Sequence, residues 1–139
     1  MARILIADDH AMMRKGLRTV IEPHDGWEIC GEATNGIEAL ELARSLNPDL
    51  VVLDVSMPGL NGLEVALRLS RTLPEIKTLL FTMHNSLQFA RDVAKSGANG
   101  YVCKSSGEEV LTQAMEMVLH GEQFFDTDGA RAKSLASGM

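Results

Sequence analysis

The chain has 139 residues, of which 45% are hydrophobic and 23% charged, and its formal net charge is −6. This length suffices for one soluble globular domain with a buried core. The negative charge, without any cluster of Lys and Arg, argues against nucleic acid as a direct partner of this chain. No apolar stretch approaches the roughly 20 residues that span a bilayer, and the amino terminus lacks the features of a signal peptide. We therefore expect a cytoplasmic protein that makes no membrane contact.

Four short apolar runs each end in polar residues. The runs cover residues 4–7, 50–53, 78–81 and 101–103, and they are followed by Asp8 and Asp9, Asp54, Thr82 and Lys104, respectively. Such runs of Leu, Ile and Val are typical of parallel strands that are buried on both faces. The carboxyl ends of parallel strands meet at one edge of the sheet, where ligands bind in open α/β folds. We therefore expect three carboxylates, a hydroxyl and an ammonium group to share one shallow site.

Segments with helical periodicity separate the apolar runs. A further short strand is plausible at residues 27–30, so strand and helix signals alternate five times along the chain. This alternation predicts an α/β domain with a five-stranded, doubly wound parallel sheet and helices on both of its faces. Helices are indicated by an apolar stripe before Pro23, by the segment from Asn35 to Asn47, by residues 62–72, by a helix that Asn85 caps, and by residues from about 110 to 119.

The fifth helix carries a wider apolar surface than one stripe. Two explanations stand side by side: the helix packs deep in its groove, or it presents a surface to another subunit or domain. After Gly121 the pattern fades into a composition typical of a linker or a frayed tail. We therefore place the domain at residues 1–121 and a linker or tail at 122–139. Cys30 and Cys103 fall in predicted strands without metal-ligand spacing, which favours buried thiols.

The polar residues at the strand ends carry chemistry that requires a cation. Asp8, Asp9 and Asp54 repel one another as three bare anions. Lys104 supplies one positive charge, and a divalent cation supplies two more. Mg²⁺ suits carboxylate and water ligands. An Asp in such a site can attack phosphorus as a nucleophile, while Mg²⁺ and Lys104 neutralise the charge that develops. One Asp or Thr at a strand end is more often a cap or a turn residue, but four such ends in one chain favour a functional site.

These residues resemble the motifs of the receiver domain of bacterial two-component response regulators. The resemblance covers residues 3 to about 121 and rests on Asp8-Asp9, Asp54 followed by residues 57–62, Thr82 and Lys104, in the family's order and spacing. It implies the flavodoxin-like (βα)5 receiver fold. It also implies a phosphoacceptor that catalyses its own phosphorylation and dephosphorylation, rather than a metabolic enzyme.

The resemblance assigns roles residue by residue. Asp54 matches the phosphoacceptor, and Lys104 matches the lysine that pairs with the phosphoryl group. The Mg²⁺ ligands would be Asp9, Asp54 and the backbone carbonyl of Ser56, with Asp8 acting through water. Thr82 and Tyr101 match the hydroxyl and aromatic pair that rearranges on activation. Ser56 and His84 lie where a side chain could tune the site; the other three histidines share no spacing and are interpreted as surface or loop residues.

The partner implied by the resemblance is a histidine kinase, and a change on the face formed by the fourth helix, fifth strand and fifth helix would carry the signal. His10 and the exit at residues 121–125 resemble the branch in which a LuxR-type helix-turn-helix output domain follows the receiver. The chain would then regulate transcription and contact DNA only through an output domain that it lacks; a homodimer is possible. Either the chain is cut within the linker, which we favour, or it is a stand-alone receiver that acts through protein–protein interaction.

Two other classes of function were weighed against this interpretation. A phosphohydrolase that resembles the haloacid dehalogenase group requires a second Asp two residues after the nucleophile, but that position is Ser56. A flavodoxin-like binding module requires an anion-binding loop after the first strand, where Asp8 and Asp9 would repel a phosphate. One departure from the receiver pattern is Ser105, which follows Lys104 where many receivers have proline.

Overall fold

The computed structural model describes residues 1–126; residues 127–139, which hold most of the predicted linker, lie outside the described part of the chain. The strands are β1 (Ala2–Ala7), β2 (Trp27–Ala33), β3 (Leu50–Leu53), β4 (Lys77–Thr82), β5 (Gly100–Cys103) and β6 (Phe124–Phe125). The helices are α1 (Ala11–Ile21), α2 (Gly36–Leu46), α3 (Gly62–Thr72), α4 (Leu87–Lys95) and α5 (Glu108–Leu119), with a short 3-10 turn, η1 (Lys104–Ser106), before α5.

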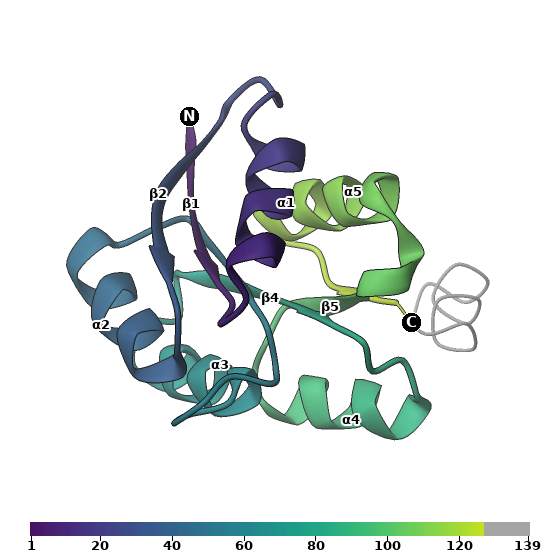
Figure 1. Cartoon of the computed structure of the whole chain (residues 1–139). Helices are drawn as coiled ribbons and strands as arrows, with labels where there is room; N and C mark the ends of the chain where they lie inside the picture. The colour runs from purple at the N-terminus through teal and green to yellow at the C-terminus, as the bar shows by residue number, and fades with distance from the viewer. Residues whose placement is uncertain (127–139) are drawn as a thin grey trace.

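All strands pair in parallel, in the order β2-β1-β3-β4-β5-β6. The order reverses at β1, so crossover helices lie on both faces of the sheet (Figure 1). The apolar runs are buried because helices cover both faces, as near-continuous runs of Leu, Ile and Val require. The predicted α/β class with a doubly wound parallel sheet is confirmed.

The predicted number of five strands is wrong, because a sixth strand lies within the segment assigned to the linker. β6 pairs with β5, and the N–H of Phe124 donates to the carbonyl of Asn99 at 3.1 Å. A side chain at Gly100 would exclude it, since a Cβ there would lie 2.0 Å from the Phe124 carbonyl oxygen. Two residues give too short a pattern to predict a strand, so the pairing depends on tertiary contact. The domain boundary at residue 121 stays a prediction.

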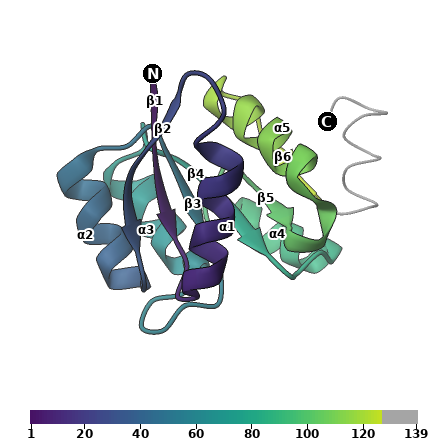
Figure 2. The same cartoon turned by 45° about the horizontal axis from the view of Figure 1, so that its top comes forward.

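The helices form one layer on each side of the sheet. α1 and α5 cover one face, and α2, α3 and α4 cover the other, as Figures 1 and 2 show from two directions. α5 buries Leu111, Ala114, Met115 and Val118, while its flanking apolar residues are partly buried against the same core. This packing favours the first explanation for the wide apolar surface of the helix. Within residues 1–126, no helix combines the length and the apolar character that crossing a bilayer requires.

Of the two helix caps predicted from the sequence, one is confirmed and one is wrong. The side chain of Asn35 accepts a hydrogen bond from the N–H of Glu38 at 2.8 Å and caps α2 as predicted. The prediction that Asn85 caps α4 is wrong, because the hydroxyl of Ser86 accepts from the N–H of Phe89 at 3.0 Å. Both residue types suit a cap, and the length of the loop after β4 decides between them. Among the described residues every peptide bond is trans, including the one after Lys104.

Candidate functional site

The register of the parallel strands brings the two buried aspartates together. Ala7 of β1 pairs with Leu53 of β3, so the next residues, Asp8 and Asp54, leave the sheet side by side. The N–H of Asp54 donates to the carbonyl of Ala7 at 2.9 Å and continues the strand pairing to the edge. The same rule places Lys104, because Thr82 of β4 pairs with Cys103 of β5. The carboxyl edge of the sheet therefore collects these side chains by its geometry alone.

Lys104 lies between the two buried carboxylates. Its Nζ is 3.3 Å from Asp8 Oδ2 and 3.5 Å from Asp54 Oδ1. The side chain of Asp8 is 1% exposed, that of Asp54 5% and that of Lys104 12%, so this pair of contacts is largely screened from water. Charges this close and this buried interact more strongly than a surface ion pair, and they fix one another's position.

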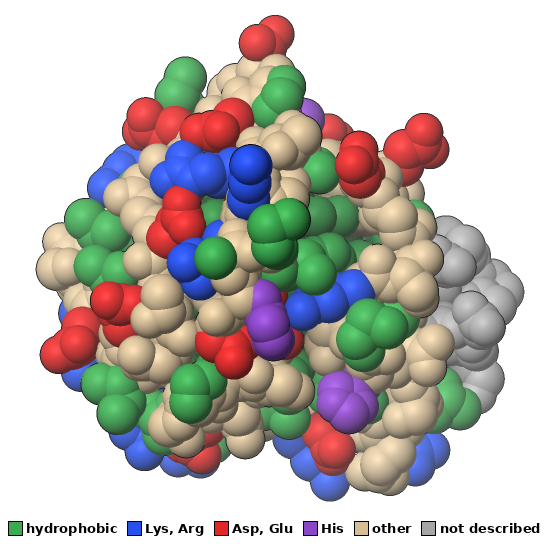
Figure 3. Space-filling view, viewed as in Figure 1, with side chains coloured by type: hydrophobic (Ala, Val, Ile, Leu, Met, Phe, Trp, Pro, Cys, Tyr) green, Lys and Arg blue, Asp and Glu red, His purple; other side chains and the backbone are tan. Residues whose placement is uncertain are grey.

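Asp9 and His10 complete the acidic cluster on its solvent side. The Nδ1 atom of His10 is 3.2 Å from Asp8 Oδ1 and 3.1 Å from Asp9 Oδ1, and its backbone N–H donates to Asp8 at 2.9 Å. Ligand atoms from Asp8, Asp9, His10 and Asp54 all lie within 4.8 Å of one another. Figure 3 shows acidic side chains beside a histidine and a basic side chain on this face of the molecule.

The donor set of this cluster fits a hard divalent cation. Carboxylate oxygens from two adjacent strand ends converge, and one side of the cluster is open to water. Such an opening suits Mg²⁺, because Mg²⁺ keeps several water ligands when it binds to a protein. One lysine offsets only part of the charge of three carboxylates. A cation would therefore relieve the repulsion that remains among Asp8, Asp9 and Asp54.

The loop after β3 holds the Asp54 side chain from the other direction. The N–H of Ser56 donates to Asp54 Oδ1 at 3.3 Å, and the N–H of Gly62 donates to the carbonyl of Val55 at 3.0 Å. A Cβ at Gly62 would lie 2.4 Å from the Asp54 carbonyl oxygen, so glycine allows the start of α3 to pack directly on the backbone of Asp54. Ser56 thus lies beside Asp54, where its backbone carbonyl could also serve a cation.

Thr82, His84 and Tyr101 lie on the β4 and β5 side of the same edge. The Thr82 side chain is buried, and its Oγ1 accepts the backbone N–H of His84 at 3.3 Å. The His84 ring stacks on Phe89 of α4 at 5.0 Å between centroids, and Phe89 in turn meets the Tyr101 ring edge-on at 5.0 Å. Stacked and edge-on rings therefore connect His84, two residues after Thr82, with Tyr101.

Tyr101 is completely buried, and its hydroxyl has no hydrogen-bond partner within residues 1–126. Burial raises the pKa of Tyr101 well above its ordinary value, and the nearby Asp126 carboxylate and Cys103 thiol raise this pKa further. The phenol therefore stays protonated and can donate a hydrogen bond. A buried hydroxyl without a partner is uncommon, since it loses its hydration without a replacement.

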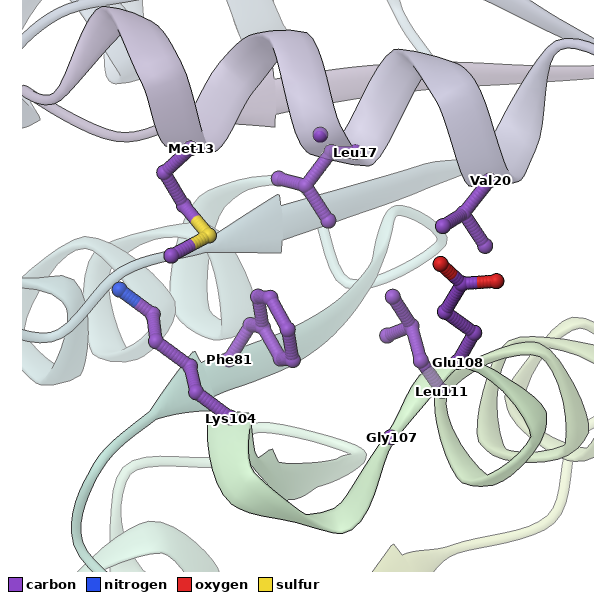
Figure 4. A pocket seen from close by; sticks show the side chains of 9 residues that line it. Met13, Leu17, Val20, Phe81, Lys104, Gly107, Glu108 and Leu111 are labelled. Atoms are coloured by element: carbon purple, nitrogen blue, oxygen red, sulfur yellow. The ribbon is translucent and has the colours of Figure 1, made fainter.

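The aliphatic stem of Lys104 lines an apolar cavity between α1 and α5 with a volume of about 190 Å³. Figure 4 shows Met13, Leu17 and Val20 on α1 facing Phe81, Leu111 and the Lys104 stem. The Lys104 ammonium also lies 5.8 Å from the centre of the Phe81 ring. Apolar contacts along the stem therefore help to hold the charged end of this side chain beside the carboxylates.

Sequence reasoning missed two contributions to this region. It interpreted His10 as a surface or loop residue, although the neighbouring acidic pair was a signal that its ring could meet carboxylates. It also placed Asp126 in a linker, but this carboxylate is buried and bonded to Ser106, in the turn that carries Lys104. A single acidic residue after two phenylalanines gives no pattern from which this contact could be predicted.

Comparison with known proteins points to one family. The family model for the response regulator receiver domain matches residues 4–116. The response regulator GacA of Pseudomonas viridiflava is 36% identical over 137 residues, which cover 99% of this chain and 64% of GacA. The response regulator UvrY of Escherichia coli K12 is 31% identical over 136 residues, which cover 98% of this chain and 62% of UvrY. The chain thus spans less than two thirds of these relatives' length.

Solved structures agree with the sequence relatives. A LuxR-family two-component response regulator from an Aurantimonas species superposes with a TM-score of 0.88 at 36% identity, and the match covers 99% of this chain and 97% of that one. The receiver domain of a response regulator named NarL from Mycobacterium tuberculosis gives 0.83 at 28% identity, with 87% of this chain and 98% of that one covered. The chain therefore belongs to the response regulator receiver domains of two-component systems, in the LuxR-type branch.

Proposed function

We propose that this receiver is a phosphorylation-controlled switch in which Asp54 accepts a phosphoryl group from a partner histidine kinase. The observation that carries the proposal is the position of the Lys104 ammonium, 3.3 Å from Asp8 and 3.5 Å from Asp54 in a largely buried setting. A phosphoryl group attached to Asp54 would place its oxygens beside this ammonium. The donor would be a phosphohistidine, as expected for a member of a two-component system.

In the transfer step, a carboxylate oxygen of Asp54 attacks phosphorus and forms an O–P bond while the P–N bond to the donor imidazole breaks. The electron pair of that bond leaves with the imidazole, which takes a proton from water. Lys104 neutralises charge on the equatorial oxygens during the transfer. In dephosphorylation, a water oxygen attacks phosphorus, the O–P bond to Asp54 breaks, and inorganic phosphate leaves while Asp54 becomes a free carboxylate again; the domain would thus catalyse its own reset and turn over no metabolite.

The cation for this site would be Mg²⁺, held by Asp9, Asp54 and the backbone carbonyl of Ser56, with Asp8 acting through water. When bound, Mg²⁺ supplies positive charge to the transferring phosphoryl oxygens. The chain's own residues would orient Asp54: the N–H of Ser56 donates to it, and the Lys104 ammonium contacts both Asp54 and the neighbouring Asp8. Ser56 and His84 would tune access to the phosphoryl group, Ser56 from the loop after β3 and His84 from the loop after β4.

The output side of the switch would be Thr82 and Tyr101. New oxygens on Asp54 attract the Thr82 hydroxyl, and Tyr101 then rearranges with the face formed by α4, β5 and α5. Support comes from the Tyr101 hydroxyl, which has no partner within residues 1–126, and from the Thr82 hydroxyl, which accepts one backbone N–H there. The signal would reach transcription through an output domain beyond this chain, which alone would contact DNA, and the phosphorylated face could pair two copies into a homodimer. Action through protein–protein contact alone is the alternative.

The test is phosphorylation with small donors, read by intact mass. With Mg²⁺, acetyl phosphate or phosphoramidate should add one phosphoryl group to the parent chain, and phosphoramidate contains the same P–N bond type as a phosphohistidine. Asp54→Asn should abolish the addition, because an amide oxygen is a poor nucleophile. Asp25→Asn, which changes an exposed carboxylate far along the chain from the site, should be modified like the parent. Unchanged modification of Asp54→Asn would contradict the assignment.

A further inference from the structure

The carboxylate of Asp126 is buried at the point where the described chain leaves the domain. Asp126 directly follows β6, and only 4% of its surface is exposed. Its Oδ2 accepts a hydrogen bond from the N–H of Cys103 at 3.1 Å and another from the hydroxyl of Ser106 at 2.5 Å. Hydrogen bonds to an ionised group are the stronger kind, and a buried carboxylate depends on them.

These two hydrogen bonds fall at the two ends of the turn that carries Lys104. Cys103 is the last residue of β5, and Ser106 is the last residue of η1 (Lys104–Ser106). Among the residues up to 126, no side chain caps the start of this turn. One oxygen of Asp126 therefore fixes the piece of backbone from which Lys104 projects toward Asp8 and Asp54. A displacement of this carboxylate would displace the base of the Lys104 side chain.

The exit segment, residues 124–126, also contacts the aromatic side of the switch. The N–H of Asp126 donates to the carbonyl of Tyr101 at 3.1 Å, and the ring of Phe125 lies 6.3 Å from the ring of Tyr101. The same short segment thus meets the strand that carries Tyr101 and the turn that carries Lys104. Both contacts lie on β5 or directly after it.

We propose that Asp126 is a positioning residue for Lys104, and that through this contact the exit segment and the phosphoryl group on Asp54 are coupled. The inference rests on the proposed function, because it needs Lys104 to pair with that phosphoryl group. Coupling between two sites is reciprocal. A correctly seated exit segment strengthens the hold of Lys104 on the phosphoryl group, and a phosphoryl group at Asp54 tightens the seating of the exit segment in return. Phosphorylation of Asp54 would therefore affect the exit segment, and the chain that follows it, through Lys104.

The first experiment measures equilibrium binding of beryllofluoride, a phosphoryl mimic, and of Mg²⁺ alone to the whole chain by calorimetry. Asp126→Ala should weaken beryllofluoride binding by at least about fivefold, the lower end of typical coupling between sites. The affinity for Mg²⁺ alone should not fall, since Lys104 is not among the proposed Mg²⁺ ligands and a displaced ammonium makes the cluster more negative, not less. Asp126→Asn should restore most of the binding because its amide oxygen still accepts both hydrogen bonds. Glu122→Ala, at an exposed site just before the exit segment, serves as the control and should bind like the parent.

If Asp126 had a purely structural role, its removal would lower the affinities for beryllofluoride and for Mg²⁺ alike. Equal beryllofluoride binding by Asp126→Ala and the parent, or an equal fall in both affinities, would overturn the inference. If Asp126→Ala does not fold, Ser106→Ala removes one of the two hydrogen bonds and should weaken beryllofluoride binding without weakening Mg²⁺ binding. A parent chain that binds Mg²⁺ but not beryllofluoride would instead contradict the proposed function.

Hydrogen exchange tests the reverse direction. Beryllofluoride should slow exchange of the Phe124 and Asp126 amides, which donate to the carbonyls of Asn99 and Tyr101. In Lys104→Met this slowing should disappear, measured at beryllofluoride concentrations that saturate the variant. Slowing of the same size in parent and variant would show that the signal reaches the exit segment without Lys104, and would overturn the coupling.

Discussion

The carboxyl edge of the sheet has two parts that are built in different ways. On the β1 and β3 side, carboxylates are held by charged and polar partners, with Lys104 beside Asp8 and Asp54 and with His10 beside Asp8 and Asp9. We call these residues the charged half. On the β4 and β5 side, the buried hydroxyls of Thr82 and Tyr101 have few partners or none within residues 1–126. We call these two the hydroxyl half.

The difference suggests that the charged half is preorganised for a phosphoryl group and that the hydroxyl half changes conformation in response to it. In the charged half Asp8, Asp54 and Lys104 are already positioned by their buried contacts, so the proposed phosphorylation of Asp54 would need little rearrangement there. In the hydroxyl half the Tyr101 hydroxyl has no partner within residues 1–126 and the Thr82 hydroxyl accepts one backbone N–H, so the proposed new acceptor at Asp54 could change which conformation is stable. The changes below test whether the two halves differ as described, starting with the largest expected effect.

Removal of the ammonium should have the largest effect on stability. Without divalent cations, Lys104→Met should lower the free energy of unfolding by about 3 kcal/mol, because it leaves two buried carboxylates without their cation. Mg²⁺ should stabilise this variant more than the parent, since the cluster becomes more negative. Thermal and urea melts measure both effects, with Lys15→Met on the exposed side of α1 as the control. A variant as stable as the parent would mean that the charged half does not depend on Lys104.

The second change removes one carboxylate from the charged half. In the presence of a chelator, Asp9→Asn should melt at a higher temperature than the parent, because unfolding no longer relieves as much repulsion. At ten times its dissociation constant, Mg²⁺ should stabilise the parent by about 1.4 kcal/mol. The variant should respond far less, because it lacks a proposed direct ligand.

Thermal melts with Mg²⁺ and with a chelator decide the question, and Asp25→Asn controls for the loss of one negative charge elsewhere. Equal Mg²⁺ responses in Asp9→Asn and the parent would remove Asp9 from the cation site. A variant less stable than the parent without Mg²⁺ would instead indicate that Asp9 has a structural role, for example through its contact with His10.

In the hydroxyl half, Tyr101→Phe should raise the free energy of unfolding by about 1 kcal/mol, because the variant no longer buries a hydroxyl without a partner. A destabilised variant would show that the hydroxyl does have a partner, and would remove the contrast between the two halves. Chemical denaturation at neutral pH measures this difference.

The same variant should change how stability depends on alkaline pH. Burial raises the pKa of Tyr101 in the folded state, so the unfolded chain releases this proton first as the pH rises. The stability that this group contributes is fully present below the ordinary tyrosine pKa of about 10 and is lost as the pH rises above it. The parent should therefore lose stability faster than Tyr101→Phe in that range. Tyr101 is the only tyrosine, so tyrosinate absorbance follows it directly and should appear only with unfolding.

The sequence predicts the charged half better than the hydroxyl half because the two depend on different kinds of information. Asp8, Asp54 and Lys104 follow buried apolar runs, and parallel strands bring such ends together whatever the loops do. The surroundings of Tyr101 depend on where α4 starts and on whether residues 124–126 return to the sheet.

Both features depend on tertiary packing. Ser86 rather than Asn85 caps α4, and a two-residue strand pairs beside Gly100. Neither result can be predicted from a local sequence pattern. β2 extends to Ala33 across an irregularity opposite β1, beyond the apolar residues that predicted it. Short-range periodicity therefore locates strands and their ends, while the edge of the sheet and the exit segment are decided by packing.

The smallest expected effect on stability belongs to Thr82. Thr82→Ala should cost less than about 1 kcal/mol, because the hydroxyl accepts only the backbone N–H of the exposed His84. Its effect should be on the signal instead. The variant should still be phosphorylated at Asp54, since the charged half is intact, but phosphorylation should change amide exchange less at Tyr101 and in α5. Thr78→Ala makes the same substitution at the opposite end of β4, beyond reach of Asp54, and should keep the full exchange difference. If Thr82→Ala keeps it as well, the hydroxyl half does not read the phosphoryl group through Thr82, and the signal must leave the charged half through Lys104 and its turn.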